Sequence, residues 1–163
     1  MKDPIFGGVL RKLSLCRKAQ NDTFLTWEDS MNRTTMRENA FKLLYEIEVQ
    51  NDVTEEHINL FFENNDLNED SVKEYISDIV NGTQLHKDSI IENVTKHLTE
   101  VWNYDRISKI NKALLKLAIY EIVYKKIDFK IIINEVVELS KKYGEDTSPG
   151  FINGILASIV KGA

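Results

Sequence analysis

Residues 107–122, with the sequence ISKINKALLKLAIYEI, constrain the fold of this chain more than any other stretch. On a helix, at about 100° per residue, the apolar side chains cover most of the circumference. These are Ile107, Ile110, Ala113, Leu114, Leu115, Leu117, Ala118, Ile119, Tyr120 and Ile122. The remaining polar strip carries Lys109, Lys112 and Lys116. This pattern predicts a central core helix, capped by Asp105 and covered on most sides, with only its lysine edge in water.

Two polar residues, Asn111 and Glu121, interrupt the apolar side of this predicted helix. Each is either a buried polar group with its own hydrogen-bond partners or a residue at a seam between packed layers. The sequence leaves both alternatives open.

The rest of the chain is typical of an all-α protein. Its 163 residues, 42% of them hydrophobic, suffice for one domain or two closely packed halves. Only two prolines and seven glycines occur, and no alternating run rich in Val, Ile and Thr indicates strands. We predict about seven helices in two packed small bundles. Besides the central helix, they span 33–50, 69–85, 89–102 and 130–143, with one ending at Phe62 and one starting after Ser148 as N-cap.

The N-terminal residues differ from the remainder. Residues 1–30 contain glycines and Pro4, and no helical stripe continues there beyond two turns. We predict a flexible or non-native extension over residues 1–30 and a domain over residues 31–163. The single cysteine, Cys16, and the lack of a membrane-length apolar run or secretory signal predict a cytoplasmic protein.

The sequence does not indicate catalysis or metal binding. The three histidines fall on separate predicted helices without a partner at ligand spacing. There is no glycine-rich phosphate loop and no G-x-S-x-G motif. Glu135 and Glu138, the nearest approach to a carboxylate pair, are typical of a solvated face. We therefore predict a binding module without enzymatic activity, metal or cofactor.

Charge is unevenly distributed along the chain, whose net charge is −5. Residues 46–74 hold ten acids and one base, whereas residues 106–142 hold nine bases and four acids. This segregation indicates either an acidic and a basic side of the molecule or ordinary solvated helix faces.

Arg33 and Arg37 lie in the first turns of the predicted helix 33–50, on the side of its apolar stripe. Cations at this end oppose the helix dipole, so local helix stability does not explain them. An anionic ligand would explain them, because arginines at i and i+4 present two planar forks to one phosphate strand. The alternative is that both are ordinary arginines at an exposed helix end.

Four blocks of sequence resemble the NusB family of bacterial transcription antitermination factors. They are NRTTMRENAFKLLYEIEVQ, W-x-x-x-R-I-x-x-I-N-K-A-L-L-K-L-A-I-Y-E-I from Trp102, IIINEVVELSKKYG, and S-P-G-F-I-N-G-I-L from Ser148. The resemblance covers about residues 33–160. It implies an all-helical, non-enzymatic protein that binds boxA RNA together with NusE, a ribosomal small-subunit protein. The pair would join other Nus factors on RNA polymerase during ribosomal RNA transcription.

The resemblance also assigns individual residues. Arg33 and Arg37 match the family's arginine-rich RNA contact, and Ser148 and Phe151 match a second RNA patch, although Phe151 is equally consistent with a core residue. A helix N-terminus suits phosphate, and an exposed ring suits an unpaired base. Lys141 lies where it would reach phosphate beside the last helix, or is simply solvated.

Three further positions, Tyr45, Asp105 and Asn111, fall where the family meets NusE. The chain departs from the family pattern at two points, with Thr34 and Thr35 where bases are common and Asn111 where an acid is common. These departures predict weaker RNA affinity or greater reliance on the partner.

Two other functions remain open. One is the NusB-like domain of an RNA cytosine methyltransferase, and the other is a helical adaptor that binds protein and no RNA. A homodimer that covers the RNA surface is also consistent with the sequence.

Overall fold

The computed structural model describes residues 25–51 and 53–162, with side chains from residue 33 onward. These residues form seven α-helices and no strand, which confirms the all-α prediction. The helices are α2 (Leu25–Gln50), α3 (Glu55–Asn64), α4 (Asp70–Leu85), α5 (Lys87–Lys96), α6 (Lys109–Ile119), α7 (Phe129–Tyr143) and α8 (Ser148–Gly162). A 3₁₀ turn, η2 (Tyr104–Arg106), precedes α6, and a π-helical turn, η3 (Tyr120–Tyr124), follows it.

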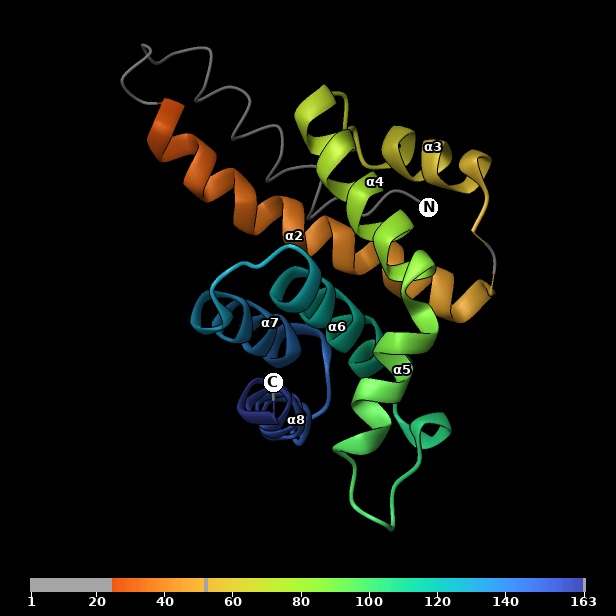
Figure 1. The fold of residues 1–163 in the computed structure, drawn as a ribbon. Helices are drawn as coiled ribbons and strands as arrows, with labels where there is room; N and C mark the ends of the chain where they lie inside the picture. The colour runs from red at the N-terminus through yellow and green to blue at the C-terminus, as the bar shows by residue number, and fades with distance from the viewer. Residues whose placement is uncertain (1–24, 52, 163) are drawn as a thin grey trace.

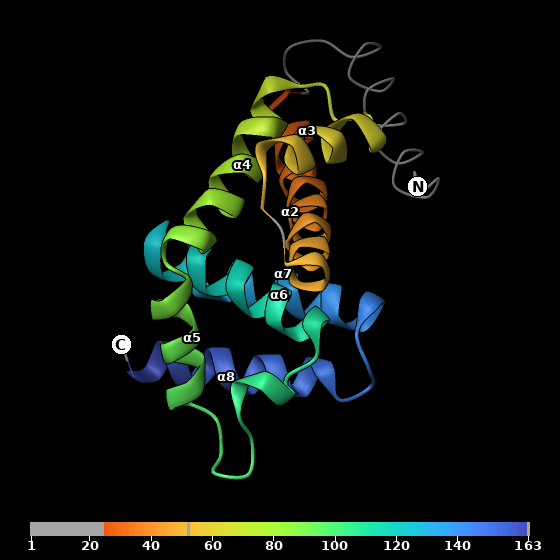
Figure 2. The same cartoon turned by 90° about the vertical axis from the view of Figure 1, so that its right-hand side faces the viewer.

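Helix α6 is the centre of the core, as its apolar pattern predicts. It packs against α2 on one side and against α7 and α8 on the other (Figure 1). The seven residues from Ala113 to Ile119 are all buried. Figure 2 shows α6 and α7 lying between α2 and α8, while α3 and α4 group with α2. The molecule is thus two small helical groups that share α6.

The lysine edge of α6 differs from the prediction at one position. Lys109 is exposed and Lys112 is half-buried, but Lys116 is only 6% exposed. Its ammonium forms an ion pair with the Glu48 carboxylate of α2. The prediction that Lys116 lies in water is wrong, because α2 crosses α6 at this turn and supplies the countercharge that burial of an ammonium requires.

Several helix ends also differ from the predictions. The N-cap of α6 is Ser108, whose Oγ accepts from the Asn111 N–H, so Asp105 is not its cap. Ser148 belongs to α8 itself rather than preceding it. Helix α5 ends at Lys96, before the predicted end at 102. The starts of α6 and α8 depend on single side-chain hydrogen bonds, of Ser108 and Ser148, that a periodic pattern does not encode.

Helix α2 begins at Leu25, eight residues before the predicted start at 33. Residues 25–32 contain no glycine or proline, so nothing in their sequence breaks a helix. The predicted boundary at residue 30 falls inside α2, and residues 1–24, Cys16 among them, lie outside the described residues. Within the described ranges, no helix has the length and apolarity to cross a bilayer.

Candidate nucleic-acid interface

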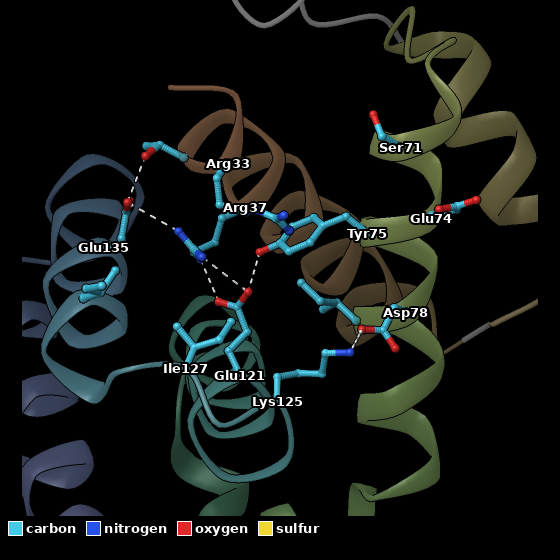
Figure 3. Close-up of a pocket in the computed structure, with 13 residues that line it drawn as sticks. Arg33, Arg37, Ser71, Glu74, Tyr75, Asp78, Glu121, Lys125, Ile127 and Glu135 are labelled. Atoms are coloured by element: carbon cyan, nitrogen blue, oxygen red, sulfur yellow. Dashed lines mark hydrogen bonds and ion pairs between the residues drawn. The ribbon is translucent and has the colours of Figure 1, made fainter. Parts of the chain in front are cut away.

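Arg37 occupies a buried ion-pair site between three elements. Its side chain is 3% exposed, and its Nε donates to Glu121 Oε2 of η3 at 2.6 Å (Figure 3). Its Nη1 lies 3.3 Å from Glu135 Oε1 of α7. Burial lowers the pKa of Arg37, but the hydrogen bond to Glu121 and the surrounding charges raise it by more, so the guanidinium stays charged.

Glu121 is held from both sides of this site. Besides Arg37, the Tyr75 hydroxyl of α4 donates to Glu121 Oε1 at 2.5 Å. Burial, and then the charge of Glu121, raises the pKa of Tyr75 well above its ordinary value, so this phenol remains a donor. Glu121 is therefore a buried polar group with its own partners, which decides between the two alternatives that the sequence left open.

This geometry contradicts the assignment of Arg37 as a direct RNA contact. The guanidinium is buried and its fork is engaged by carboxylates, so it does not face a phosphate strand. The ion pair also explains why a cation lies on the apolar side of α2, at the middle of this helix. The sequence carried a signal for it, since Arg37 and Glu121 are opposite charges on two predicted core faces.

Arg33 lies one turn earlier, is exposed, and borders a cleft between α2, α4, η3 and α7. Its guanidinium carbon lies 4.6 Å from the centroid of the Tyr75 ring, which places a cation over an aromatic face. The cleft has a volume of about 1040 Å³. Lys125 lines the same cleft and forms an ion pair with Asp78 at 3.0 Å. Figure 3 shows Arg33 beside the Tyr75 ring and Arg37 between Glu135 and Glu121.

The second predicted RNA patch lies at the start of α8. Ser148 is 1% exposed, and its Oγ accepts from the Glu145 N–H at 3.0 Å. This burial contradicts Ser148 as a surface contact; the residue stabilises the turn before α8. Phe151 is half-buried, packs against the core, and keeps part of its ring at the surface. Lys141, in the last turn of α7, forms an exposed ion pair with Glu138 at 2.9 Å.

Trp102 is a further candidate to which the sequence reasoning gave no role. It follows α5 in the segment before η2, and its ring centroid lies 6.2 Å from that of Phe151 with 40° between the planes. The side chain is 51% exposed. The only sequence signal is an aromatic residue in the polar segment after α5, since no periodic pattern includes it.

The structure does not bring Arg33 and Phe151 into one cleft. Helix α7 lies between α2 and α8, and contacts α2 through the hydrogen bond from Thr34 Oγ1 to Glu135 and through Lys142, which pairs with Glu38 at 2.6 Å. Its opposite side packs on α8. Lys141 is exposed in the last turn of α7, the helix that separates the two patches.

The three residues predicted to meet a protein partner lie around the α2–α6 contact. Tyr45 is 37% exposed on α2, and Asp105 is exposed on η2. Asn111 is half-buried on α6, and its Oδ1 has no hydrogen-bond partner among the described residues. Lys109 Nζ donates to the Glu48 carbonyl oxygen at 3.3 Å, which holds the start of α6 beside the last turns of α2.

A metal site is not formed by the described residues, which include no cluster of three or more His, Cys, Asp and Glu side chains able to hold an ion. The buried charges of the cleft are instead neutralised by one another, as in Arg37 with Glu121.

Comparisons with known proteins agree on one family. The model of the NusB family matches residues 34–161. The transcription antitermination protein NusB of Acetivibrio thermocellus is 45% identical over 132 residues, covering 80% of this chain and 90% of that protein. NusB of Bacillus subtilis is 35% identical over 130 residues, covering 79% of this chain and 95% of that protein.

Comparisons with solved structures also identify NusB proteins. NusB in a crystal structure of the antitermination factors NusB and NusE in complex with double-stranded RNA is similar with a TM-score of 0.74 and 25% identity, covering 80% of this chain and 97% of that chain. NusB of T. maritima is similar with a TM-score of 0.71 and 30% identity, covering 79% of this chain and 90% of that chain. On its helices, its buried core and these relatives, the chain belongs to the NusB family.

Proposed function

We propose that the protein is a transcription antitermination factor that binds boxA-type RNA together with NusE and joins the other Nus factors on RNA polymerase during ribosomal RNA transcription. The observation that carries this proposal is the likeness to the NusB chain of a NusB–NusE–RNA complex, which extends over 97% of that chain. In this role the protein acts in the cytoplasm, by binding and without catalysis.

The RNA surface in this proposal consists of Arg33, Lys141 and Phe151. Arg33 and Lys141 are exposed cations on two adjacent helices, suited to phosphate contacts. Phe151 offers part of a ring to a base. Bases inside a duplex are already stacked on one another, whereas unpaired bases are free to stack on a ring, so we propose single-stranded RNA as the ligand. Arg37 and Ser148 support this surface from inside, by fixing α2 and the turn before α8.

The NusE surface in this proposal is the area around Tyr45, Asp105 and Asn111. An exposed tyrosine beside an aromatic neighbour is typical of interface hot spots, and the Tyr45 ring lies 6.5 Å from that of Phe41. A carboxylate on η2 and a carboxamide on α6 supply polar contacts at its edge.

The antitermination role is favoured over a methyltransferase-linked domain by the relatives themselves. The similarity spans 99% of the Clostridium novyi antitermination protein, so the matched region is essentially that whole protein. Measured RNA binding distinguishes this role from that of an adaptor that binds protein alone.

The test is binding of a labelled boxA-type RNA, followed by fluorescence anisotropy with and without NusE over a salt series. We expect NusE to raise the affinity, a scrambled RNA to bind more weakly, and affinity to fall as salt rises. Equal binding of the scrambled RNA would overturn sequence-specific recognition. Failure of the protein to co-elute with NusE would overturn the partnership, and NusE binding without any RNA binding would favour the adaptor.

A further inference from the structure

Trp102 and Phe151 form an aromatic pair at the surface from segments about fifty residues apart. Trp102 lies between α5 and η2, and Phe151 lies in the first turn of α8. With the ring planes tilted by 40° and centroids 6.2 Å apart, neither ring covers the other. A tryptophan that is half exposed leaves a large apolar face in water, which is unfavourable unless a ligand covers it.

We propose that Trp102 is a second base-stacking residue, which takes an unpaired base of the bound RNA next to the base held by Phe151. This inference rests on the proposed RNA-binding function and adds a residue to that surface.

The Trp102 ring is held on a short ordered segment. The Trp102 N–H donates to the Thr99 carbonyl oxygen at 2.9 Å. Asn103 then caps η2, because its Oδ1 accepts from the Arg106 N–H at 3.1 Å. These bonds fix the backbone on both sides of the ring, so a base that stacks there costs little ordering entropy.

The surroundings of the pair favour RNA over a protein partner. Next to Phe151, the outer side of α8 carries Gly150, Asn153 and Gly154, all exposed. A Cβ added at either glycine would meet nothing within 4 Å. A bare helix surface with one carboxamide leaves room for a nucleobase beside the rings and offers hydrogen bonds to a base edge. The core of a protein interface would need further apolar side chains there.

The exposed side chains near the pair are both acidic and basic, and this balance favours stacking over a phosphate contact. Glu100 and Asp105 are exposed on the Trp102 side, and Glu145 and Asp146 are exposed before α8. Arg106 is the exposed cation of η2. A phosphate group would be poorly stabilised here, whereas stacking on a neutral base is insensitive to this balance. The contribution of Trp102 to affinity should therefore be nearly independent of salt.

The test compares Trp102→Ala, Trp102→Phe and Lys141→Ala in RNA binding with NusE present, over a salt series. We expect Trp102→Ala to weaken binding on the order of tenfold with an unchanged salt slope, and Trp102→Phe to retain most of the affinity. Lys141→Ala, the matched charge control, should instead reduce the salt slope. Wild-type affinity in Trp102→Ala would overturn the inference, as would a loss of NusE binding in the absence of RNA.

A fluorescence readout separates this inference from the proposed function. The chain has two tryptophans, so a Trp27→Phe background leaves Trp102 as the single indole emitter. We expect its emission to be quenched by boxA-type and by scrambled single strands, since stacking tolerates any base. Quenching by both RNAs at equal affinity would overturn boxA specificity and leave the stacking role supported. RNA binding without quenching would overturn the stacking role alone.

Discussion

The Arg37 guanidinium and the Glu121 carboxylate form a buried ion pair, with 2.6 Å between Nε and Oε2, that joins α2 to the turn after α6. The Tyr75 hydroxyl donates to the same carboxylate, so three elements of the core meet at one charged group. A cation that the sequence placed at an RNA contact is therefore a structural residue, and its neighbour Arg33 carries the exposed charge.

Arg37→Ala should destabilise the fold by about 3–5 kcal/mol, because it leaves the Glu121 carboxyl group buried without its main partner. Urea unfolding followed by circular dichroism measures this loss. The double variant Arg37→Met with Glu121→Leu should recover a large part of it, since both charges are removed together. A fully stable Arg37→Ala that loses only RNA affinity would restore the direct-contact assignment.

Arg33→Ala should leave stability within about 0.5 kcal/mol of wild type, because the side chain is exposed. In RNA binding it should lower the salt slope by about 0.7, the value for one phosphate contact on a single strand. Lys125→Ala is the matched control, since Lys125 lines the same cleft but is paired with Asp78. Equal effects of the two variants on the salt slope would argue against a specific contact by Arg33.

Tyr45→Ala should weaken NusE binding on the order of tenfold while leaving the fold intact, because the ring is 37% exposed at the proposed interface. Isothermal titration calorimetry with purified NusE gives the affinity. Val49→Ala, one turn further along α2 and 49% exposed, serves as the control with a small expected effect. If Val49→Ala weakens binding as much as Tyr45→Ala, the contact is not centred on Tyr45.

Stability should fall as pH rises from about 10 to 12. Burial, and then the hydrogen bond to Asp78, raises the pKa of Tyr120 to about 12. A tyrosine whose pKa is higher in the folded state than its unfolded value of about 10 stabilises the fold fully below pH 10, and this contribution is lost as pH rises through the folded pKa. Urea unfolding between pH 9 and 12 measures the loss.

The companion variant for this pH dependence is Tyr120→Phe, which should show a smaller loss over the same range. Tyr75 keeps its own contribution in that variant, because burial also raises its pKa. A Tyr120→Phe curve parallel to wild type would show that Tyr120 does not contribute.

Gly82→Ala should destabilise the fold by about 1–3 kcal/mol, because the added Cβ would overlap the Tyr120 ring and force it to move. Gly154→Ala is the opposite case, since its Cβ would meet nothing within 4 Å in a helix interior. That variant should stabilise α8 by up to about 1 kcal/mol. Thermal unfolding of the two variants measures whether Gly82→Ala lowers and Gly154→Ala raises the stability. Destabilisation of similar size in both would contradict the packing argument.

The fold was largely predictable from sequence because burial follows helical periodicity. The arc through residues 107–122 identified the central helix, and Ala113 to Ile119 are buried. Lys116 was misplaced because its burial depends on Glu48, which lies sixty-eight residues away and meets it only where α2 crosses α6. Periodicity describes one helix at a time and does not report such crossings.

The candidate site was predicted only in part for the same reason. Arg37 and Ser148 were both assigned to RNA contacts, yet both are buried, because each has a partner that the sequence does not place beside it. The sequence signal for the buried partner of Arg37 was Glu121, a charged residue on a predicted apolar helix face. Trp102 could not be assigned from a pattern, because its neighbour Phe151 is brought to it by the packing of α8.

The position of α7 between α2 and α8 has a consequence for ligand length. A helix with its side chains is about 10–12 Å across, so an oligonucleotide that touches only Arg33 or only Phe151 gains one weak attachment. A strand long enough to pass over α7 gains both, and the second attachment forms at a high effective concentration. Affinity should consequently increase in a step, rather than gradually, once the oligonucleotide can bridge this helix.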